Sequence, residues 1–206
     1  MRRQTLLLGT SKTNQYTALA PGALRLDPTE LKPWPEIFQT TDKAVVEASC
    51  ADDDFTLEWK ANDGIRISNA VPAMRVHPLT KQEIWSNHAQ VFHPSTAYQE
   101  YMTLASYTKR WTFYLWAMVA FVLLMVSRLV RKEKDFPMNT VFGDESIISD
   151  SDMRIVRDVI WKHTINNPWQ IGDVVYIDNK AVSHGRLPYG DFSGKQRKVL
   201  VAWSAE

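Results

Sequence analysis

The stretch that decides the fold is Trp169-Gln-Ile-Gly-Asp-Val-Val-Tyr-Ile-Asp-Asn-Lys-Ala-Val-Ser-His-Gly-Arg-Leu-Pro-Tyr189, followed after a short loop by Arg197-Lys-Val-Leu-Val-Ala-Trp203. Gly172 belongs to a turn signal, and the run from Val174 to Ile177 is β-branched or aromatic throughout. Such a run predicts a strand that is buried on both faces. A second strand is predicted from Val199 to Trp203, and we expect the two strands to pair antiparallel.

Two polar side chains stand beside these predicted strands. His184 follows the first strand, and Arg197 stands at the entrance to the second. If the strands pair within a barrel, both side chains face one cavity, which is the geometry of a site. On spacing alone the simpler interpretation is a loop histidine and a solvated charge at the edge of a sheet.

The same phrase, from Gly172 to Tyr189 and from Arg197 to Trp203, resembles the C-terminal signature of the taurine dioxygenase and clavaminate synthase-like family of iron(II)/2-oxoglutarate oxygenases. Weaker similarity extends back through Thr140–Asp144 and Glu83–His93 to about Pro35. The resemblance implies an α+β fold, with an incomplete double-stranded β-helix (jelly-roll) core and flanking helices. One long apolar helix, which has no counterpart in the simplest relatives, is expected to be inserted into this core.

The resemblance also implies roles for individual residues. His184 corresponds to the distal histidine of the iron site, and Arg197 to the arginine that binds the far carboxylate of 2-oxoglutarate. Iron(II) that activates oxygen is typically held by two histidines and one carboxylate, which leaves open positions for cosubstrate and oxygen. Arginine suits a carboxylate because its planar fork donates two parallel hydrogen bonds. Asn87 lies in a segment that borders the cavity in relatives and is a candidate substrate-side residue.

The other two iron ligands of the family are missing from this sequence. They come from a His-x-Asp or His-x-Glu motif upstream of the segment that Glu83–His93 resembles. The five histidines are followed two positions later by Leu79, Gln90, Ser95, Ile165 and Arg186, none of which is a carboxylate. The chain is therefore either the C-terminal part of a longer enzyme or a degenerate relative that no longer binds iron in the usual way.

Composition narrows the class of protein. A chain of 206 residues with 45% hydrophobic and 11% aromatic residues is expected to form a folded domain with a core. The net charge of +1 predicts no nucleic-acid partner. Cys50 is the only cysteine, so no intramolecular disulfide forms, and we expect a passive thiol in an intracellular, cytoplasmic or membrane-associated protein.

The chain before the similar region is expected to be irregular. Residues 1–35 carry four prolines without helical or strand periodicity, and the apolar run Leu6–Leu8 is too short for a signal peptide. The oxygenase-like domain is expected to span residues 36–206. It begins with a helix that starts at Thr41-Asp42 and has an apolar face of Ala44, Val45 and Ala48.

Several strands and one more helix are predicted within that domain. The clearest hairpin joins Phe55–Lys60 to Ile65–Ser68 through Asn62-Asp-Gly, residues that tolerate positive φ. Pro72–His77 and Glu83–Phe92 are predicted as two further strands. Because strand side chains alternate, His88 and His93 would project to opposite faces and could not clasp one metal ion. Thr140–Asp144 is a predicted short strand. A helix capped by Ser149 should turn one face inward, made of Met153, Val156, Val159, Ile160 and His163.

The segment from Trp111 to Ser127 has no charged residue, glycine or proline, and basic residues flank it on both sides. We expect one continuous helix from about Tyr107 to Lys132, within an insertion at about 107–134. The uncharged segment Trp111–Ser127 is at the lower limit of length for a membrane span. A helix that crosses the bilayer would leave the strands before it and the strands after it on opposite sides. The alternatives are that Trp111–Val130 lies in the membrane interface, covers the site as a lid, or contacts another subunit. We expect several large side chains of this helix to be exposed, namely Trp111, Phe113, Tyr114, Phe121 and Leu124. The basic residues that follow are expected to contact anionic head groups, namely Arg128, Arg131, Lys132 and Lys134.

Two functions follow from the sequence. The first is an iron(II)/2-oxoglutarate oxygenase, or the C-terminal portion of one. Its expected substrate is a small molecule, which would be lipophilic if the apolar helix is a lid over it. The second is a non-catalytic, membrane-associated or interaction protein that keeps the end of the fold without the iron site.

Overall fold

The computed structural model describes residues 11–18, 32–168, 170–185 and 202, and for residues 11–17 it describes the backbone only. The chain divides into two units, residues 1–173 and 174–206. Each unit is described by itself below. The first contains every helix and strand of the described residues.

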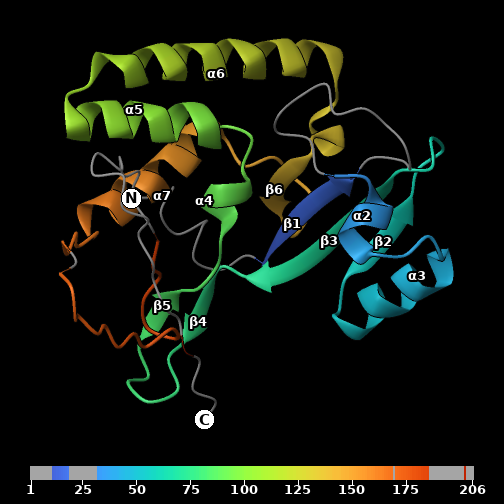
Figure 1. Ribbon diagram of the computed structural model, residues 1–206. Coiled ribbons are helices and arrows are strands. Elements are labelled where there is room, and N and C mark those ends of the chain that lie inside the picture. Colours follow the sequence, from blue (N-terminus) through green and yellow to red (C-terminus); the bar gives the residue numbers. More distant parts are fainter. Residues whose placement is uncertain (1–10, 19–31, 169, 186–201, 203–206) are drawn as a thin grey trace. The chain divides into compact units, whose positions relative to one another are not determined.

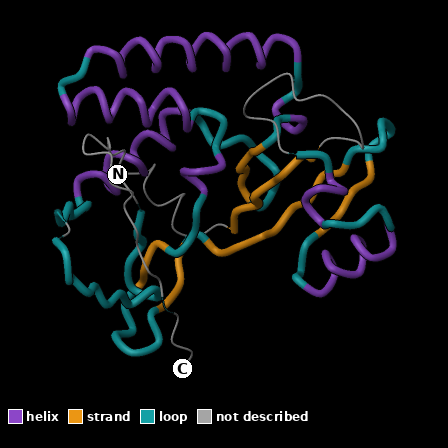
Figure 2. Tube along the Cα trace, in the orientation of Figure 1, coloured by secondary structure: helices purple, strands orange, loops and turns teal. Residues whose placement is uncertain are grey.

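A four-stranded antiparallel sheet, in the order β2-β3-β1-β6, forms the framework of the first unit (Figures 1 and 2). The hairpin of β2 (Thr56–Trp59) and β3 (Ile65–Pro72) pairs Trp59 with Ile65 and Thr56 with Ser68, as predicted. Its turn holds Asp63 at a φ of 59°, a left-handed conformation that Asp tolerates better than most residues. The local turn signal was therefore sufficient to place this hairpin.

Strand β1 (Ser11–Ala18) corrects the expectation of an irregular N-terminal segment. It lies between β3 and β6, and pairs antiparallel with both. Its sequence, SKTNQYTA, has no apolar alternation, so pattern gave no sign of a strand. The strand is stabilised by backbone hydrogen bonds to its neighbours on both sides, and not by an apolar side-chain pattern.

A first core lies where two short helices meet the sheet. Helix α2 (Trp34–Phe38) and helix α3 (Lys43–Asp52) place Trp34, Val46 and Cys50 against Ala18 and Ile65. The Asp42 side chain caps α3 by accepting from the Ala44 N–H at 2.9 Å, as the sequence predicted. Fully burying a side chain such as Val46 or Ile65 contributes about 1.5–3 kcal/mol.

The predicted inner face of α3 was wrong. Ala44, Val45 and Ala48 are exposed, and α3 buries Val46 and Cys50, which are one turn apart. The buried face of α3 is set by tertiary contacts, because the apolar surface of the neighbouring sheet and of Trp34 lies on the side of the helix that carries Val46 and Cys50.

The second predicted pair of strands is shorter than expected. Strands β4 (Met74–Val76) and β5 (Glu83–Trp85) pair antiparallel, with Met74 opposite Trp85. The chain then forms helix α4 (Ala89–Phe92) and not a continued strand. A short apolar run does not distinguish strand from helix, and here Asn87 accepts from the Ala89 N–H at 2.9 Å, which favours the helical turn.

The apolar segment Trp111–Ser127 lies within one helix, as predicted, but that helix begins at Trp111 and not at about Tyr107, because the chain breaks at Lys109. Helix α5 (Thr96–Thr108) ends at Lys109, whose φ is 57°, and helix α6 (Trp111–Val130) then runs alongside it (Figure 1). Tyr98 and Phe121 make an edge-to-face ring contact across the pair, with centroids 5.4 Å apart. The break gives α6 an apolar surface to pack on, which one continuous helix would lack.

The remaining elements close a second core. Strand β6 (Met138–Phe142) follows the short 3₁₀ helix η1 (Glu133–Asp135), and helix α7 (Asp150–Lys162) follows a turn. Ile148, Met153 and Ala89 are fully buried together. The Ser149 hydroxyl caps α7 by accepting from the Asp152 N–H at 3.1 Å, as predicted.

The predicted inner face of α7 was only partly right. Met153 is buried, but Val159 and His163 are exposed, and Arg157 takes a buried position one turn after Met153. Val156 and Ile160 are half-buried.

In the second unit, the described residues form no strand. Val174 and Tyr176 are 92% and 90% exposed, whereas the sequence predicted a strand from Val174 to Ile177 buried on both faces. A strand needs a partner for its N–H and C=O groups, and none is present among the described residues. The predicted partner, Val199–Trp203, lies outside the described residues except for Ala202.

Candidate functional site

His184 lies in the second unit, in a stretch without regular structure. The preceding turn is closed by hydrogen bonds from the Ala181 and Val182 N–H groups to the Asp178 carbonyl, at 3.0 and 3.1 Å. His184 itself is exposed. Arg197 lies outside the described residues, so a shared cavity for the two side chains stays a prediction.

Asn87, the candidate substrate-side residue, is buried and holds two backbone segments together. Its Nδ2 donates to the Ala73 carbonyl at 2.7 Å, and its Oδ1 accepts from the Ala89 N–H. One end of the amide therefore holds the residue before β4 and the other end holds the turn into α4, so both ends are engaged within the protein.

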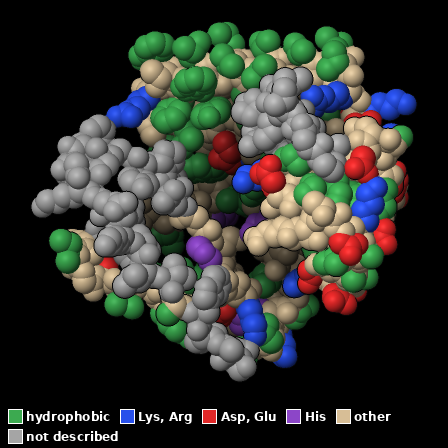
Figure 3. All heavy atoms as spheres, turned by 45° about the vertical axis from the view of Figure 1, so that its right-hand side comes forward, with side chains coloured by type: hydrophobic (Ala, Val, Ile, Leu, Met, Phe, Trp, Pro, Cys, Tyr) green, Lys and Arg blue, Asp and Glu red, His purple; other side chains and the backbone are tan. Residues whose placement is uncertain are grey.

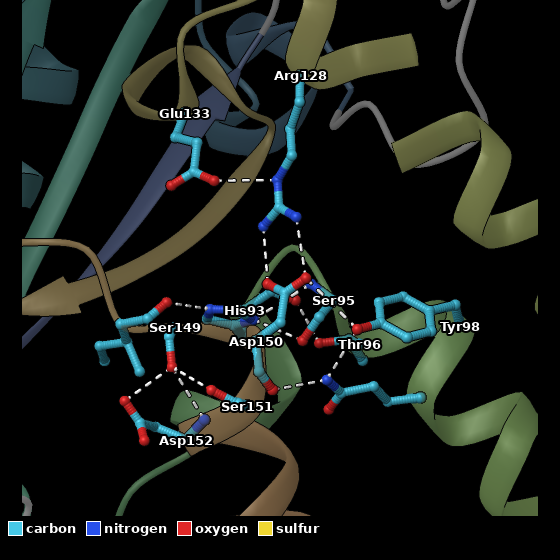
Figure 4. Close-up of polar contacts among 12 residues, drawn as sticks. His93, Ser95, Thr96, Tyr98, Arg128, Glu133, Ser149, Asp150, Ser151 and Asp152 are labelled. Atoms are coloured by element: carbon cyan, nitrogen blue, oxygen red, sulfur yellow. Dashed lines mark hydrogen bonds and ion pairs between the residues drawn. The ribbon is translucent and has the colours of Figure 1, made fainter. Parts of the chain in front are cut away.

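His93 occupies a fixed place in a buried polar cluster (Figure 4). Its Nδ1 accepts from the Ser95 N–H at 3.2 Å and lies 2.7 Å from the Ser95 hydroxyl, so the proton is on Nε2, which donates to the Ile148 carbonyl at 2.9 Å. Burial lowers the pKa of His93, and the Ile148 carbonyl and Asp150 only partly oppose it. A neutral histidine with both nitrogens engaged links the chain after α4 to the start of α7.

The other histidines of the first unit do not gather around a common point. His77 accepts from the Leu79 and Thr80 N–H groups at 3.3 and 3.1 Å. His88 is exposed at the start of α4, and His163 at the end of α7. Across the described residues, no group of three His, Cys, Asp or Glu side chains is placed to hold a metal ion.

Next to His93, an ion-pair network fixes the end of α6 (Figure 4). Arg128 donates to both carboxylate oxygens of Asp150, at 2.9 and 2.7 Å, and its Nε donates to Glu133 at 3.0 Å. Burial tends to raise the pKa of Asp150, but the hydrogen bonds and charge of Arg128 outweigh burial and hold that pKa below its usual range. Arg128 was expected to contact lipid head groups and instead ties α6 to α7, because a bidentate carboxylate lies within reach.

Arg157 is a buried cation that sequence reasoning missed. The residue is 1% exposed, and its guanidinium donates to Gln99 Oε1 at 2.9 Å, to Glu100 Oε1 at 2.5 Å, to Thr96 Oγ1 at 2.8 Å and to the Gln90 carbonyl. Burial lowers its pKa, and Glu100 opposes that effect. Its spacing of four from Met153 was the available signal, but arginine is so rarely buried that the pattern was assigned to apolar residues alone.

A shallow depression of about 610 Å³ lies where α6 ends against the hairpin of β2 and β3. Five basic residues line it against two carboxylates, and Asp135 accepts from Lys60 at 2.9 Å and from Arg66 at 3.3 Å. The hydrogen bond from Lys60 lowers the pKa of Asp135, even though burial opposes the shift. The basic lining residues are Lys60, Arg66, Arg131, Lys132 and Lys134. The sequence alone did not show that residues 60–66 and 131–135 meet.

Comparison with known proteins adds what the geometry of the described residues cannot. The family model described as "Taurine catabolism dioxygenase TauD, TfdA family" matches residues 25–203, a range that includes positions 184 and 197. The chain is 33% identical over 169 residues to the dapdiamide synthesis protein DdaC of Enterobacter agglomerans, covering 82% of this chain and 44% of that protein. It is 24% identical over 170 residues to a clavaminate synthase-like protein of Arabidopsis thaliana, covering 82% and 40%. The chain thus spans less than half the length of these two relatives.

Proposed function

The chain belongs to the TauD, TfdA family of dioxygenases, and from this membership we propose that it carries one part of an iron(II)- and 2-oxoglutarate-dependent oxygenase site. In this proposal His184 is the distal iron ligand and Arg197 binds the far carboxylate of 2-oxoglutarate. The substrate is a small molecule, and the protein acts inside the cell. The jelly-roll core of the family is part of the same proposal.

The observation that carries the proposal is the extent of the family match, which runs without division through the phrase that contains both residues. Bound iron(II) would supply the activation of oxygen. The chain's own part is to present one imidazole to the metal and one guanidinium to the cosubstrate. An arginine keeps its charge at every physiological pH and offers a carboxylate two parallel hydrogen bonds.

The residues present do not fit a complete iron site. The described residues contain no group of three ligands, and none of the five histidines in the sequence is followed two places on by a carboxylate. One imidazole cannot hold iron(II) against water. We therefore assign the chain a partial site, whose other ligands come from outside these 206 residues.

Calorimetry under anaerobic conditions tests the partial site. We expect no tight one-to-one binding of iron(II) to the chain, and no difference between the chain and its His184→Ala variant. Tight binding that His184→Ala abolishes would contradict the proposal, because a full ligand set would then exist within the chain.

Ligand-observed NMR with 2-oxoglutarate tests Arg197 separately. We expect a weak signal of binding that Arg197→Leu removes and Arg197→Lys partly keeps. Arg154→Leu is the matched control, since Arg154 is an exposed arginine on α7. Equal binding by Arg197→Leu and Arg154→Leu would overturn the role of Arg197.

A second candidate function is a non-catalytic relative that has lost the iron site. The observation that favours it is that the part of the chain that the structure describes holds no group of three possible ligands. The two candidates differ in what precedes Met1 in the gene. A His-x-Asp or His-x-Glu codon pattern upstream, in frame, favours the oxygenase, and a protein extended through it should decarboxylate 2-oxoglutarate to succinate. Absence of that pattern favours the non-catalytic relative.

A further inference from the structure

Helix α6 presents an apolar face that the described residues leave uncovered. Ala117 and Leu124 are buried toward α5, and Phe113 stacks on Tyr101 with centroids 6.3 Å apart. The opposite side, here called the outer face, is exposed along the helix. It consists of Leu115, Met118, Val119, Val122, Leu123 and Val126. These residues recur at helical spacing, so they lie on one side of the helix. Figure 3 shows hydrophobic side chains gathered along the top of the view, over α6.

The helix is long and apolar enough to cross a membrane by length and composition, and Ala117 and Leu124 are its buried residues. Its attachments argue against a crossing. Ring contacts to α5 occur at Phe113 and at Phe121, and Arg128 is tied to Asp150 and Glu133. The helix is thus held to its own domain near both ends, and a span would require these contacts to break. A helix held along its length can lie in the plane of a membrane interface.

Positive charge flanks the outer face at both ends. Lys109 and Arg110 precede α6, and the basic depression described above begins where α6 ends, with Val130 in its lining. Between Lys109 and Lys132 the chain has no acidic residue. Trp111 at the start of the helix is largely exposed, as an interfacial tryptophan would be. The apolar face therefore ends in cationic surface at both sides.

This charge pattern discriminates between occupants of the outer face. A second copy of the chain would bring its own basic ends against those of the first, whether the two α6 helices ran parallel or antiparallel, and like charges would repel. An anionic phospholipid surface supplies acyl chains for the outer face and phosphates for the basic ends. Such a surface complements both features at once.

We propose that α6 is an in-plane membrane-binding element that recognises anionic phospholipid. The outer face enters the boundary between head groups and acyl chains, and lipid phosphates bind at the basic depression beside Lys132 and Lys134. This proposal does not depend on the proposed oxygenase site, and it stands or falls separately from that proposal.

Flotation of the full chain with vesicles tests the proposal. We expect the protein to float with phosphatidylcholine vesicles that contain about 30% phosphatidylserine, and to float much less with phosphatidylcholine alone. Raising the salt to about 0.5 M should release it, because exposed charges are screened within a few ångströms at that ionic strength. Binding that survives high salt and carbonate extraction would indicate a crossing helix and overturn the in-plane arrangement.

Two variants test the two halves of the surface. Lys132→Gln with Lys134→Gln should weaken partitioning into anionic vesicles about 30-fold, at about 5-fold for each lysine near the surface. Val119→Ser with Val122→Ser should weaken partitioning into the same vesicles at least about 10-fold, because the outer face loses apolar area. Both pairs are exposed, and circular dichroism checks that the fold is kept.

The matched controls are Lys81→Gln and Leu79→Ser, which alter an exposed lysine and an exposed leucine in the turn before β5. They should bind like the parent chain. Equal losses in the controls, or equal flotation with neutral vesicles, would refute recognition by this surface. A stable dimer in solution that Val119→Ser with Val122→Ser dissociates would assign the outer face to a second copy instead.

Discussion

Replacing Arg157 by methionine should lower the free energy of unfolding by about 3 kcal/mol. The change keeps the length of the side chain but removes donors to Gln99, Glu100, Thr96 and the Gln90 carbonyl. Breaking a buried ion pair from one side costs about 3–5 kcal/mol. The lower end applies here because the Glu100 side chain is 36% exposed and keeps a hydrogen bond from Trp161. The largest remaining penalty is the buried Gln99 oxygen, left without its donor at about 1–3 kcal/mol.

Urea unfolding, followed by tryptophan fluorescence, measures the effect. Arg154→Met on the same helix is the control, since Arg154 is 67% exposed and its ion pair with Asp158 is long, at 3.9 Å. That control should cost less than about 0.5 kcal/mol. Arg157→Lys keeps the charge but not the fork, and should fall between the two. If Arg157→Met and Arg154→Met destabilise the protein equally, the buried network does not hold α7 to α5.

Two further predictions concern titration and reactivity. Burial lowers the pKa of His93, so near pH 6.5 the imidazole takes up a proton in the unfolded chain but stays neutral in the folded chain. The free energy of unfolding should therefore fall as the pH drops below about 6.5. His93→Gln should flatten this dependence of stability on pH, measured by urea unfolding between pH 7.5 and 5. The loss of stability that comes from protonating Asp150 should begin only below about pH 3.9. An unchanged slope in the His93→Gln variant would mean that the imidazole is exposed to solvent. Burial, together with Asp53, raises the pKa of the Cys50 thiol, so a disulfide reagent at pH 8 should modify native protein at least about 100-fold more slowly than protein in urea. Fast modification of native protein would mean that the core around Trp34 and Ile65 is open.

Local signals in the sequence were sufficient wherever a few adjacent residues decide the conformation. The hairpin turn at Asn62-Asp-Gly, the Asp42 cap of α3 and the Ser149 cap of α7 all form as predicted. In each case the deciding contact lies within three residues, or the backbone demands a residue type that the sequence supplies.

The failures have a common physical origin in tertiary contacts. The break at Lys109 has no glycine or proline to signal it, and it exists because α6 can pack on α5 only if the chain reverses there. The inner face of α3 and the burial of Arg157 depend on which surfaces the neighbouring elements offer. Such choices are made between segments far apart in sequence, where periodicity is silent.

The candidate site, too, could be predicted from the sequence only in part. Resemblance identified the family through a long phrase with fixed spacings, and the family match agrees with it. The roles of His184 and Arg197 stay predictions. The basic depression could not be foreseen, because it joins residues 60–66 to residues 131–135 through the fold of the sheet.

The central position of strand β1 sets the moment at which the sheet can close during biosynthesis. Its partner β6 begins at Met138, about 120 residues after β1 ends, and a ribosome adding about 5–20 residues per second needs about 6–24 s to cover that distance. In that interval β1 can pair with β3, but its other edge stays open to the strands of neighbouring nascent chains. The polar sequence SKTNQYTA makes that edge a poor seed for aggregation. The composition that hides this strand from pattern analysis would thus protect it on the ribosome until β6 arrives.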